Sequence, residues 1–192
     1  MSKDKAHDIF VTLGASNHTE NEREHNDYYA TEPKATNLLL EVEDFTNTIL
    51  EPCCGEGHIS KQLIQGGYTV ISSDLINRGY GEVKDFYDIK ECEHDIVTNP
   101  PYKIALPLLK HALDIIPKGR KVAMFLKLLF LEGKERGKFF AENPPKTIYV
   151  ASGRLTCAKN GDFDKFPSGA VAYAWYVWEK GYKGEPTIKW IN

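Results

Sequence analysis

The sequence predicts one α/β domain built around a doubly wound, mostly parallel sheet. Short apolar runs rich in β-branched residues alternate along the chain with segments whose apolar residues recur at helical spacing. A glycine-rich turn follows the first of these runs, and two prolines end a later one. At 192 residues, of which 42% are hydrophobic and 27% charged, the chain can bury one sizeable core but not two typical ones.

The expected strands and helices follow from this alternation. We predict strands over residues 46–51, 68–74, 81–84, 95–98, 121–126, 147–150 and 170–178. We predict helices over residues 34–42, 58–64, 105–116 and 131–141. Thr31 is expected to cap the first helix, and Pro33 suits its first turn. The buried face of this helix would comprise Leu38, Leu39 and Val42.

Composition limits the setting in which the protein works. No apolar run approaches the roughly 20 residues of a membrane-spanning helix, and residues 1–8 lack the apolar stretch of a signal peptide. We therefore expect a cytoplasmic protein without a membrane partner. Residues 1–25 are polar and show no apolar periodicity, so we expect a flexible lead-in before a folded domain over residues 26–192.

Charge and cysteine usage argue against two classes of protein, those that coat nucleic acid without specificity and those that bind a metal through cysteines. The net charge of −3 argues against a protein that coats nucleic acid without specificity, so any nucleic-acid binding must depend on a local basic patch. The four cysteines contain no Cys-x-x-Cys pair. We expect them to be reduced thiols, and we expect no metal site.

The segment Asn99-Pro100-Pro101-Tyr102 directly follows an apolar run. Its prolines cannot continue a strand, so the chain must turn at Asn99, at the carboxyl end where open α/β sheets bind ligands. Asn99 offers a side-chain carbonyl, Pro100 a backbone carbonyl and Tyr102 a flat ring. Two acceptors and a stacking surface suit a planar heterocycle that carries an NH2 group. Taken alone, the tetrapeptide could equally be a plain strand terminator.

Two other segments carry ligand-binding patterns. Glu51-Pro52-Cys53-Cys54-Gly55-Glu56-Gly57 joins a predicted strand to a predicted helix, and its glycines permit positive φ and close approach of a ligand. It lacks the third glycine of a dinucleotide fingerprint, which would fall at Ser60. Asp74 ends the next strand 17 residues after Gly57, where an acid can accept hydrogen bonds from ribose hydroxyls.

Together, Glu51-Pro-x-x-Gly-x-Gly and the tetrapeptide resemble the cofactor and catalytic motifs of S-adenosylmethionine-dependent amino-methyltransferases, above all the DNA adenine-N6 methyltransferases. The motifs lie between Asp27 and Tyr102, and the remainder is similar by strand pattern only. One departure is Cys53-Cys54, where many relatives carry a small or acidic residue. The resemblance implies the class I methyltransferase (Rossmann-like) fold, with a seven-stranded sheet whose last strand is antiparallel.

The resemblance also implies S-adenosyl-L-methionine as cofactor and DNA as partner. It is to a minimal phage or bacterial type without a separate target recognition domain, from which we expect a short or relaxed target sequence. Tyr29 to Pro33 would cover the methionine end of the cofactor, Glu51 would bind its ammonium group, and Asp85 would hold its adenine amine. The implied cofactor residues are Tyr29, Thr31, Pro33, Glu51, Pro52, Cys53, Gly55, Gly57, Asp74, Leu75, Asp85, Phe86 and Asn99.

Catalysis is assigned by the same resemblance to Asn99, Pro100, Pro101 and Tyr102, with Tyr102 holding a base flipped from its stack. Residues 152–167 form a predicted long loop that is too polar for a core and mixes cations with aromatic rings. This loop and Tyr102 are the candidate substrate contacts. The loop residues concerned are Arg154, Lys159, Phe163, Lys165 and Phe166.

Two other classes of function stay open. The tetrapeptide is shared by methyltransferases that act on RNA bases or on protein glutamine, and the identity of the methylated macromolecule would discriminate among them. The third class is a non-catalytic binding module with a methyltransferase-like fold. A failure to bind the cofactor would favour that class.

Overall fold

The computed structural model describes residues 29–159 and 171–192. The strands are β1 (Tyr29–Thr31), β2 (Thr48–Glu51), β3 (Thr69–Asp74), β4 (Glu82–Val83), β5 (Asp95–Thr98), β6 (Lys121–Lys127), β7 (Thr147–Ala151), β8 (Cys157–Lys159), β9 (Tyr173–Glu179) and β10 (Thr187–Ile191). The α-helices are α2 (Pro33–Leu40), α3 (His58–Gln65), α4 (Ala105–Ile115) and α5 (Lys134–Glu142). Short 3₁₀ turns are η2 (Phe86–Asp88), η3 (Tyr102–Ile104) and η4 (Leu128–Leu131).

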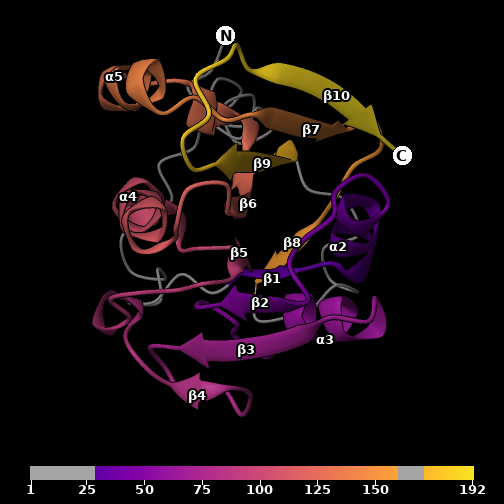
Figure 1. Ribbon diagram of the computed structural model, residues 1–192. Coiled ribbons are helices and arrows are strands. Elements are labelled where there is room, and N and C mark those ends of the chain that lie inside the picture. Colours follow the sequence, from indigo (N-terminus) through magenta and orange to yellow (C-terminus); the bar gives the residue numbers. More distant parts are fainter. Residues whose placement is uncertain (1–28, 160–170) are drawn as a thin grey trace, which may run out of the picture.

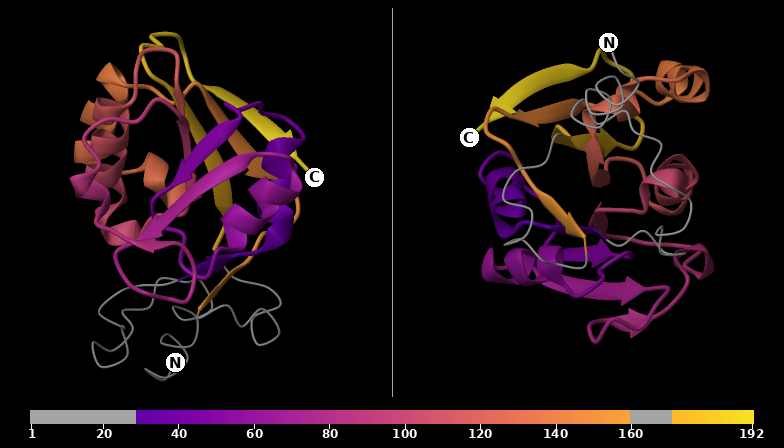
Figure 2. Two further views of the ribbon diagram at one scale, coloured as in Figure 1. Left: turned by 60° about the horizontal axis from the view of Figure 1, so that its bottom comes forward. Right: turned by 180° about the vertical axis from the view of Figure 1, so that it is seen from behind.

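Eight strands form one mixed sheet in the order β10-β7-β9-β6-β5-β2-β3-β4 (Figure 1). Every neighbouring pair is parallel except the two pairs made by β9, which runs antiparallel to both β6 and β7. Helices α4 and α5 lie on one side of the sheet and α2 and α3 on the other, so the sheet is doubly wound (Figures 1 and 2). Strands β1 and β8 form a separate antiparallel pair.

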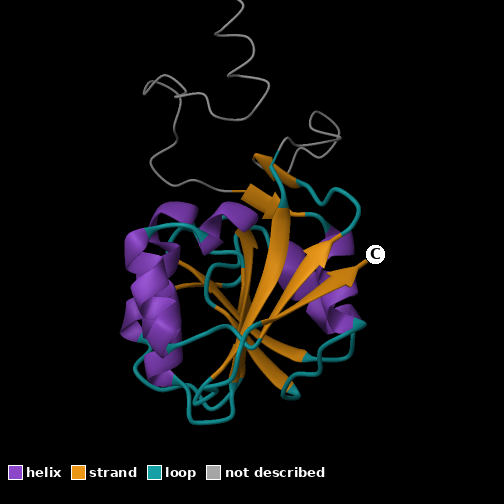
Figure 3. Ribbon diagram, turned by 90° about the horizontal axis from the view of Figure 1, so that it is seen from above, coloured by secondary structure: helices purple, strands orange, loops and turns teal. Residues whose placement is uncertain are grey.

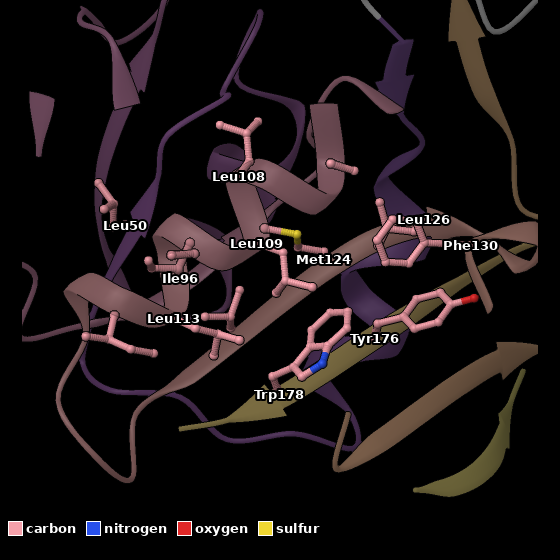
Figure 4. Packing of buried hydrophobic residues seen from close by; sticks show 14 of the residues in the cluster. Leu50, Ile96, Leu108, Leu109, Leu113, Met124, Leu126, Phe130, Tyr176 and Trp178 are labelled. Atoms are coloured by element: carbon pink, nitrogen blue, oxygen red, sulfur yellow. The ribbon is translucent and has the colours of Figure 1, made fainter. Parts of the chain in front are cut away.

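Successive side chains of the central strands point to opposite faces of the sheet and build two hydrophobic cores. On β6, Met124 and Leu126 face the α4 side, whereas Phe125 faces the α2 and α3 side. On β9, Trp178 faces the α4 side and Trp175 faces the α2 and α3 side, and both are essentially inaccessible to solvent. This period of two is what a sheet covered on both faces requires. Figure 4 shows the α4 side, where leucines of the helix pack against Ile96, Met124 and Trp178.

The predicted fold class is confirmed, with one addition to the sheet. Each of the seven predicted strands is present, and the last of them, β9, is the antiparallel one. Strand β10 was not predicted. Four of its five residues are exposed and only Ile191 is buried, so this edge strand lacks the apolar pattern of a covered one.

The first helix differs from its prediction at both ends. Thr31 belongs to β1 and does not cap α2; the residue at the N-cap is Glu32, whose side chain makes no capping hydrogen bond among the described residues. Pro33 occupies the first turn, as expected. The helix ends at Leu40, so Val42 lies beyond it and is 43% exposed rather than buried. The pairing of Thr31 with β8 removes it from the capping position.

Part of the predicted polar loop packs into the fold. Leu155, Thr156 and Ala158 are buried, and residues 157–159 form β8, so this part of the prediction was wrong. Strand pairing with β1 satisfies its backbone, which the sequence pattern did not show. Residues 160–167, and with them Phe163, Lys165 and Phe166, lie outside the described residues, as does the predicted lead-in over residues 1–25. None of the helices in the described ranges is long and apolar enough to cross a membrane.

Candidate active site

A pocket of about 280 Å³ opens at the carboxyl ends of β2, β3 and β5. The chain runs from β2 to β3 on one side and then returns to β5 on the other, so β2 and β5 flank the point where strand order reverses. Crevices at such switch points are the usual ligand sites of open α/β sheets. The short strands β1 and β8 lie beyond one end of the long central strands (Figure 3). Their pair contributes Tyr29, Ala30 and Thr31 to the pocket wall.

Asn99 follows β5 and its side-chain amide is held by β1. Nδ2 donates to the backbone carbonyl of Tyr29 at 3.0 Å and to the hydroxyl of Thr31 at 2.9 Å. The other amide atom, Oδ1, is buried and has no hydrogen-bond partner among the described residues. A buried acceptor without a donor costs free energy, on the order of 1–3 kcal/mol. Asn99 lines the pocket, so the arrangement leaves an acceptor for a ligand that brings an N–H group.

Tyr102 is embedded in a cluster of aromatic rings. Its ring stacks on Tyr29 at 5.9 Å and lies 6.0 Å from Tyr173, and Lys127 Nζ sits 4.7 Å from its centre. Its hydroxyl donates to Cys157 Sγ at 3.3 Å, and burial raises the pKa of Tyr102 well above its usual range. The ring is therefore fixed in place. A planar ligand that stacks on Tyr102 would therefore lie beside Tyr29, Tyr173 and Lys127.

Glu51 ends β2 and is almost wholly buried at the pocket. Burial raises the pKa of Glu51 to about 8, and a hydrogen bond donated by Ser60 Oγ offsets only part of this effect. Ser60 Oγ also lies 2.6 Å from Ser72 Oγ, which completes a small buried network. At neutral pH the carboxyl is thus mostly protonated, and a neighbouring cation would favour its ionised form.

Asp74 ends β3 and ties the glycine loop to the sheet. Its Oδ2 accepts from the Gly55 N–H at 2.9 Å, and its Oδ1 accepts from the Ile76 N–H at 3.0 Å. Each carboxylate oxygen can accept a second hydrogen bond, so both stay available to a pair of hydroxyl groups in the pocket. Asp85 also accepts a hydrogen bond from the backbone: its Oδ1 caps η2 by accepting from the Tyr87 N–H at 2.9 Å.

Gly57 is required by packing within the protein. Its φ is +79°, and a Cβ at this position would lie 2.5 Å from the ring of Tyr80. Any side chain here would be strained in its backbone and would displace Tyr80. The sequence prediction attributed this glycine to close approach of a ligand, whereas the structure shows a tyrosine ring over it.

The pocket collects most of the predicted site residues. All four residues of the tetrapeptide line it. So do ten of the thirteen predicted cofactor residues: Tyr29, Thr31, Glu51, Pro52, Cys53, Asp74, Leu75, Asp85, Phe86 and Asn99. Pro33, Gly55 and Gly57 are not part of its lining. Among the predicted substrate residues, Tyr102 lines the pocket, Arg154 is exposed and does not line it, and Lys159 belongs to β8.

Several pocket residues were not singled out from the sequence. They are Ala30, His58, Ile59, Arg78, Tyr87, Lys103, Ile104 and Leu108. Most of them directly follow or precede residues that were predicted, so extending each motif by one or two positions would have found them. Arg78 stands in a connection without a regular pattern, and no sequence signal marks it.

The fold is shared with solved methyltransferase structures. A putative RNA methyltransferase from Pyrococcus horikoshii is similar at 15% identity and a TM-score of 0.59, over 94% of this chain and 99% of that one. A modification subunit of a putative type I restriction enzyme from Vibrio vulnificus is similar at 11% identity and a TM-score of 0.57, over 99% of this chain and 52% of that one.

A putative class I S-adenosylmethionine-dependent methyltransferase from Listeria monocytogenes matches at 12% identity and a TM-score of 0.54, over 95% of this chain and 70% of that one. No protein-family model matches the sequence, and no curated protein matches it. At these identities the similarity establishes the class I methyltransferase, Rossmann-like fold.

Proposed function

We propose that this protein is an S-adenosylmethionine-dependent methyltransferase that methylates the N6 amine of adenine in DNA. The observation that carries the proposal is the unpaired, buried Oδ1 of Asn99 at the wall of the pocket. Asn99 stands first in Asn99-Pro100-Pro101-Tyr102, the segment that resembles the catalytic motif of amino-methyltransferases. An exocyclic amine supplies the N–H donor that this acceptor lacks.

The pocket has the chemistry that the proposed cofactor needs. The two oxygens of Asp74 suit the ribose hydroxyls, and buried Glu51 suits the ammonium group of the methionine part. Phe86, 4% exposed, and the half-buried Ile76 offer apolar surface for the adenine ring. When bound, S-adenosylmethionine supplies a sulfonium methyl group that a nucleophile can attack directly.

The residues of the tetrapeptide act on the acceptor nitrogen. The lone pair of an adenine amine is delocalised into the ring, which makes the amine a poor nucleophile. Asn99 Oδ1 and the carbonyl oxygen of Pro100 would accept the two amine hydrogens, favour a pyramidal nitrogen and stabilise the positive charge that develops on it. Their positions are fixed before the substrate arrives, by β1 for Asn99 and by proline rings for the Pro100 carbonyl.

DNA is chosen over other acceptors because the motifs, and their order along the chain, resemble those of DNA adenine-N6 methyltransferases. A base within a duplex must leave its stack before its amine can reach the pocket. The half-buried aromatic cluster around Tyr102 would hold such a base at its edge. Methyl transfer to RNA or to a protein glutamine would use the same acceptors.

One experiment tests the reaction and its substrate together. The purified protein is incubated with cofactor labelled in the methyl group and, in separate reactions, with DNA, RNA and a protein mixture. Nucleoside and amino-acid analysis then identifies the product. We expect label in N6-methyladenine from DNA, and label only in RNA or in glutamine would replace DNA by that substrate. Cofactor binding without transfer to any of them would indicate a binding module.

A further inference from the structure

The orientation of the Asn99 amide is decided by a single backbone carbonyl. The oxygen of Tyr29 can only accept hydrogen bonds, so the Asn99 atom 3.0 Å from it must be the nitrogen. Turning the amide by half a rotation would place Oδ1 against that oxygen, with no proton between the two acceptors. The hydroxyl of Thr31, 2.9 Å from Nδ2, holds the second N–H. Both contacts come from β1, a strand outside the main sheet.

Strand β1 is itself held by β8. The two strands pair in antiparallel register, with Thr31 opposite Cys157. Beyond the pair, Glu32 N donates to the Thr156 carbonyl at 3.2 Å and Thr156 N donates to Glu32 Oε1 at 2.9 Å. These contacts hold β1 in register against β8 at the end where Thr31 lies.

The same strand pair contacts Tyr102. Cys157 Sγ accepts from the Tyr102 hydroxyl at 3.3 Å and lies 3.7 Å from Asn99 Nδ2. Tyr29 stacks on the ring of Tyr102. The β1–β8 pair therefore fixes both functional side chains of the tetrapeptide, from segments 70 and 58 residues away in sequence from Asn99.

Building on the proposed function, we propose that Thr31 is a positioning residue for the transfer step. Its hydroxyl accepts the second N–H of Asn99 and so helps to hold the amide in the orientation that the Tyr29 carbonyl selects, with Oδ1 available to the substrate amine. The residue acts through Asn99, in addition to the cofactor contact that its place in the pocket wall allows. Thr31 is 2% exposed, so its hydroxyl has little access to water as an alternative partner.

The test compares three substitutions of buried threonines. Thr31→Val keeps the shape and removes the hydroxyl, Thr31→Ser keeps the hydroxyl, and Thr36→Val is the matched control. Thr36 lies in the neighbouring helix α2, is fully buried, and its hydroxyl has no partner in the described part of the chain. Measurements are the single-turnover rate of methyl transfer with saturating cofactor and the cofactor dissociation constant from calorimetry.

We expect Thr31→Val to lower the transfer rate about tenfold, the size of one net hydrogen bond, while cofactor affinity changes much less. Thr31→Ser should restore most of the rate, and Thr36→Val should transfer methyl groups as the unmodified protein does. The proposal is overturned if Thr31→Val keeps its rate, if Thr31→Ser is as slow as Thr31→Val, or if the whole effect of Thr31→Val lies in cofactor affinity.

A readout that needs no activity separates this proposal from the proposed function. The side-chain NH2 of Asn99 gives a pair of nitrogen–proton NMR signals, which are assigned by their loss in Asn99→Ala. In Thr31→Val these signals should shift and exchange with water faster, whereas Thr36→Val should leave them in place. Unchanged signals in Thr31→Val refute the positioning role. If the unmodified protein methylates nothing, the proposed function fails while the NMR result still decides how Asn99 is held.

Discussion

The pocket has two halves that are built differently. The half formed by β2 and β3 contains Glu51 and Asp74, whose carboxyl groups already have hydrogen-bond partners within that half, such as Ser60 and Gly55. These partners are between 2 and 19 residues away in sequence. The half formed by β5 draws on β1 and β8, at distances of 70 and 58 residues, and leaves Asn99 Oδ1 unpaired.

With the proposed function, this difference predicts that cofactor binding and methyl transfer depend on different halves of the pocket. The carboxyl groups of Glu51 and Asp74 already have hydrogen-bond partners, so they are held rigidly. A ligand gains binding free energy there only through the additional contacts that it makes. An acceptor that is held in place without a partner gains most when a donor arrives and carries developing charge. We therefore expect changes in the first half to alter cofactor affinity, and changes in the second half to alter the rate of transfer.

The sharpest test of this separation is Asn99→Ala. Loss of one preorganised acceptor should lower turnover by roughly 100-fold or more, because the hydrogen bond is strongest in the transition state. Cofactor affinity should stay within a few-fold of the unmodified protein. Steady-state kinetics and calorimetry provide the two numbers. Near-normal turnover in this variant would mean that another group polarises the amine.

Asp74→Ala tests the opposite half. Removing a charge-assisted acceptor of the ribose hydroxyls should weaken cofactor binding by about 10- to 100-fold. The matched control is Asp88→Ala, an exposed acid of η2 that does not line the pocket. Unchanged affinity in a folded Asp74→Ala protein would remove Asp74 from the binding half.

Glu51 should make cofactor binding depend on pH. With a pKa of about 8 in the free protein, the carboxyl must lose its proton to pair with an ammonium group. Affinity should therefore rise as pH increases toward 8, by at most about tenfold per pH unit. Glu51→Gln should bind more weakly and without this slope, as measured by calorimetry from pH 6 to 8. A slope that persists in the variant would assign it to another group.

The same carboxyl affects stability with a defined sign. Its pKa is raised from 4.5 in the unfolded chain to about 8 in the fold, so the folded protein binds one more proton between these values. The free energy of unfolding should consequently fall as pH rises through this window, by at most about 1.4 kcal/mol per pH unit. Denaturant unfolding of the Glu51→Gln variant should show a smaller fall.

The smallest effect is expected at the Tyr102 hydroxyl. Tyr102→Phe keeps the ring between its aromatic neighbours and loses only a weak bond to Cys157 sulfur, so substrate affinity should change less than about threefold. Tyr102→Ala removes the ring and should cost about 1–3 kcal/mol in substrate interaction. Equal losses in both variants would show that the hydroxyl, and not the ring, is what matters.

The sequence by itself determined the features that depend on neighbouring residues. Short apolar runs predicted the seven strands and their doubly wound sheet, because burial on both faces is written separately into each of the central strands β2, β5, β6 and β9. The Asn99 tetrapeptide was found because it directly follows an apolar run, and Asp74 because it ends a predicted strand 17 residues after Gly57. Parallel strands bring their carboxyl ends to the same edge, which is why these local signals converge on one pocket.

Only the tertiary structure decided which groups are in contact at the pocket. Thr31 reads as a helix cap in the sequence, yet in the structure it belongs to β1 and accepts a hydrogen bond from Asn99 across 68 residues. Glu51 reads as a charged acid, but burial beside Ser60 raises its pKa. The need for glycine at position 57 comes from Tyr80, which lies over it. Periodicity and spacing report burial and local backbone geometry, whereas these properties depend on which distant groups the closed chain brings into contact.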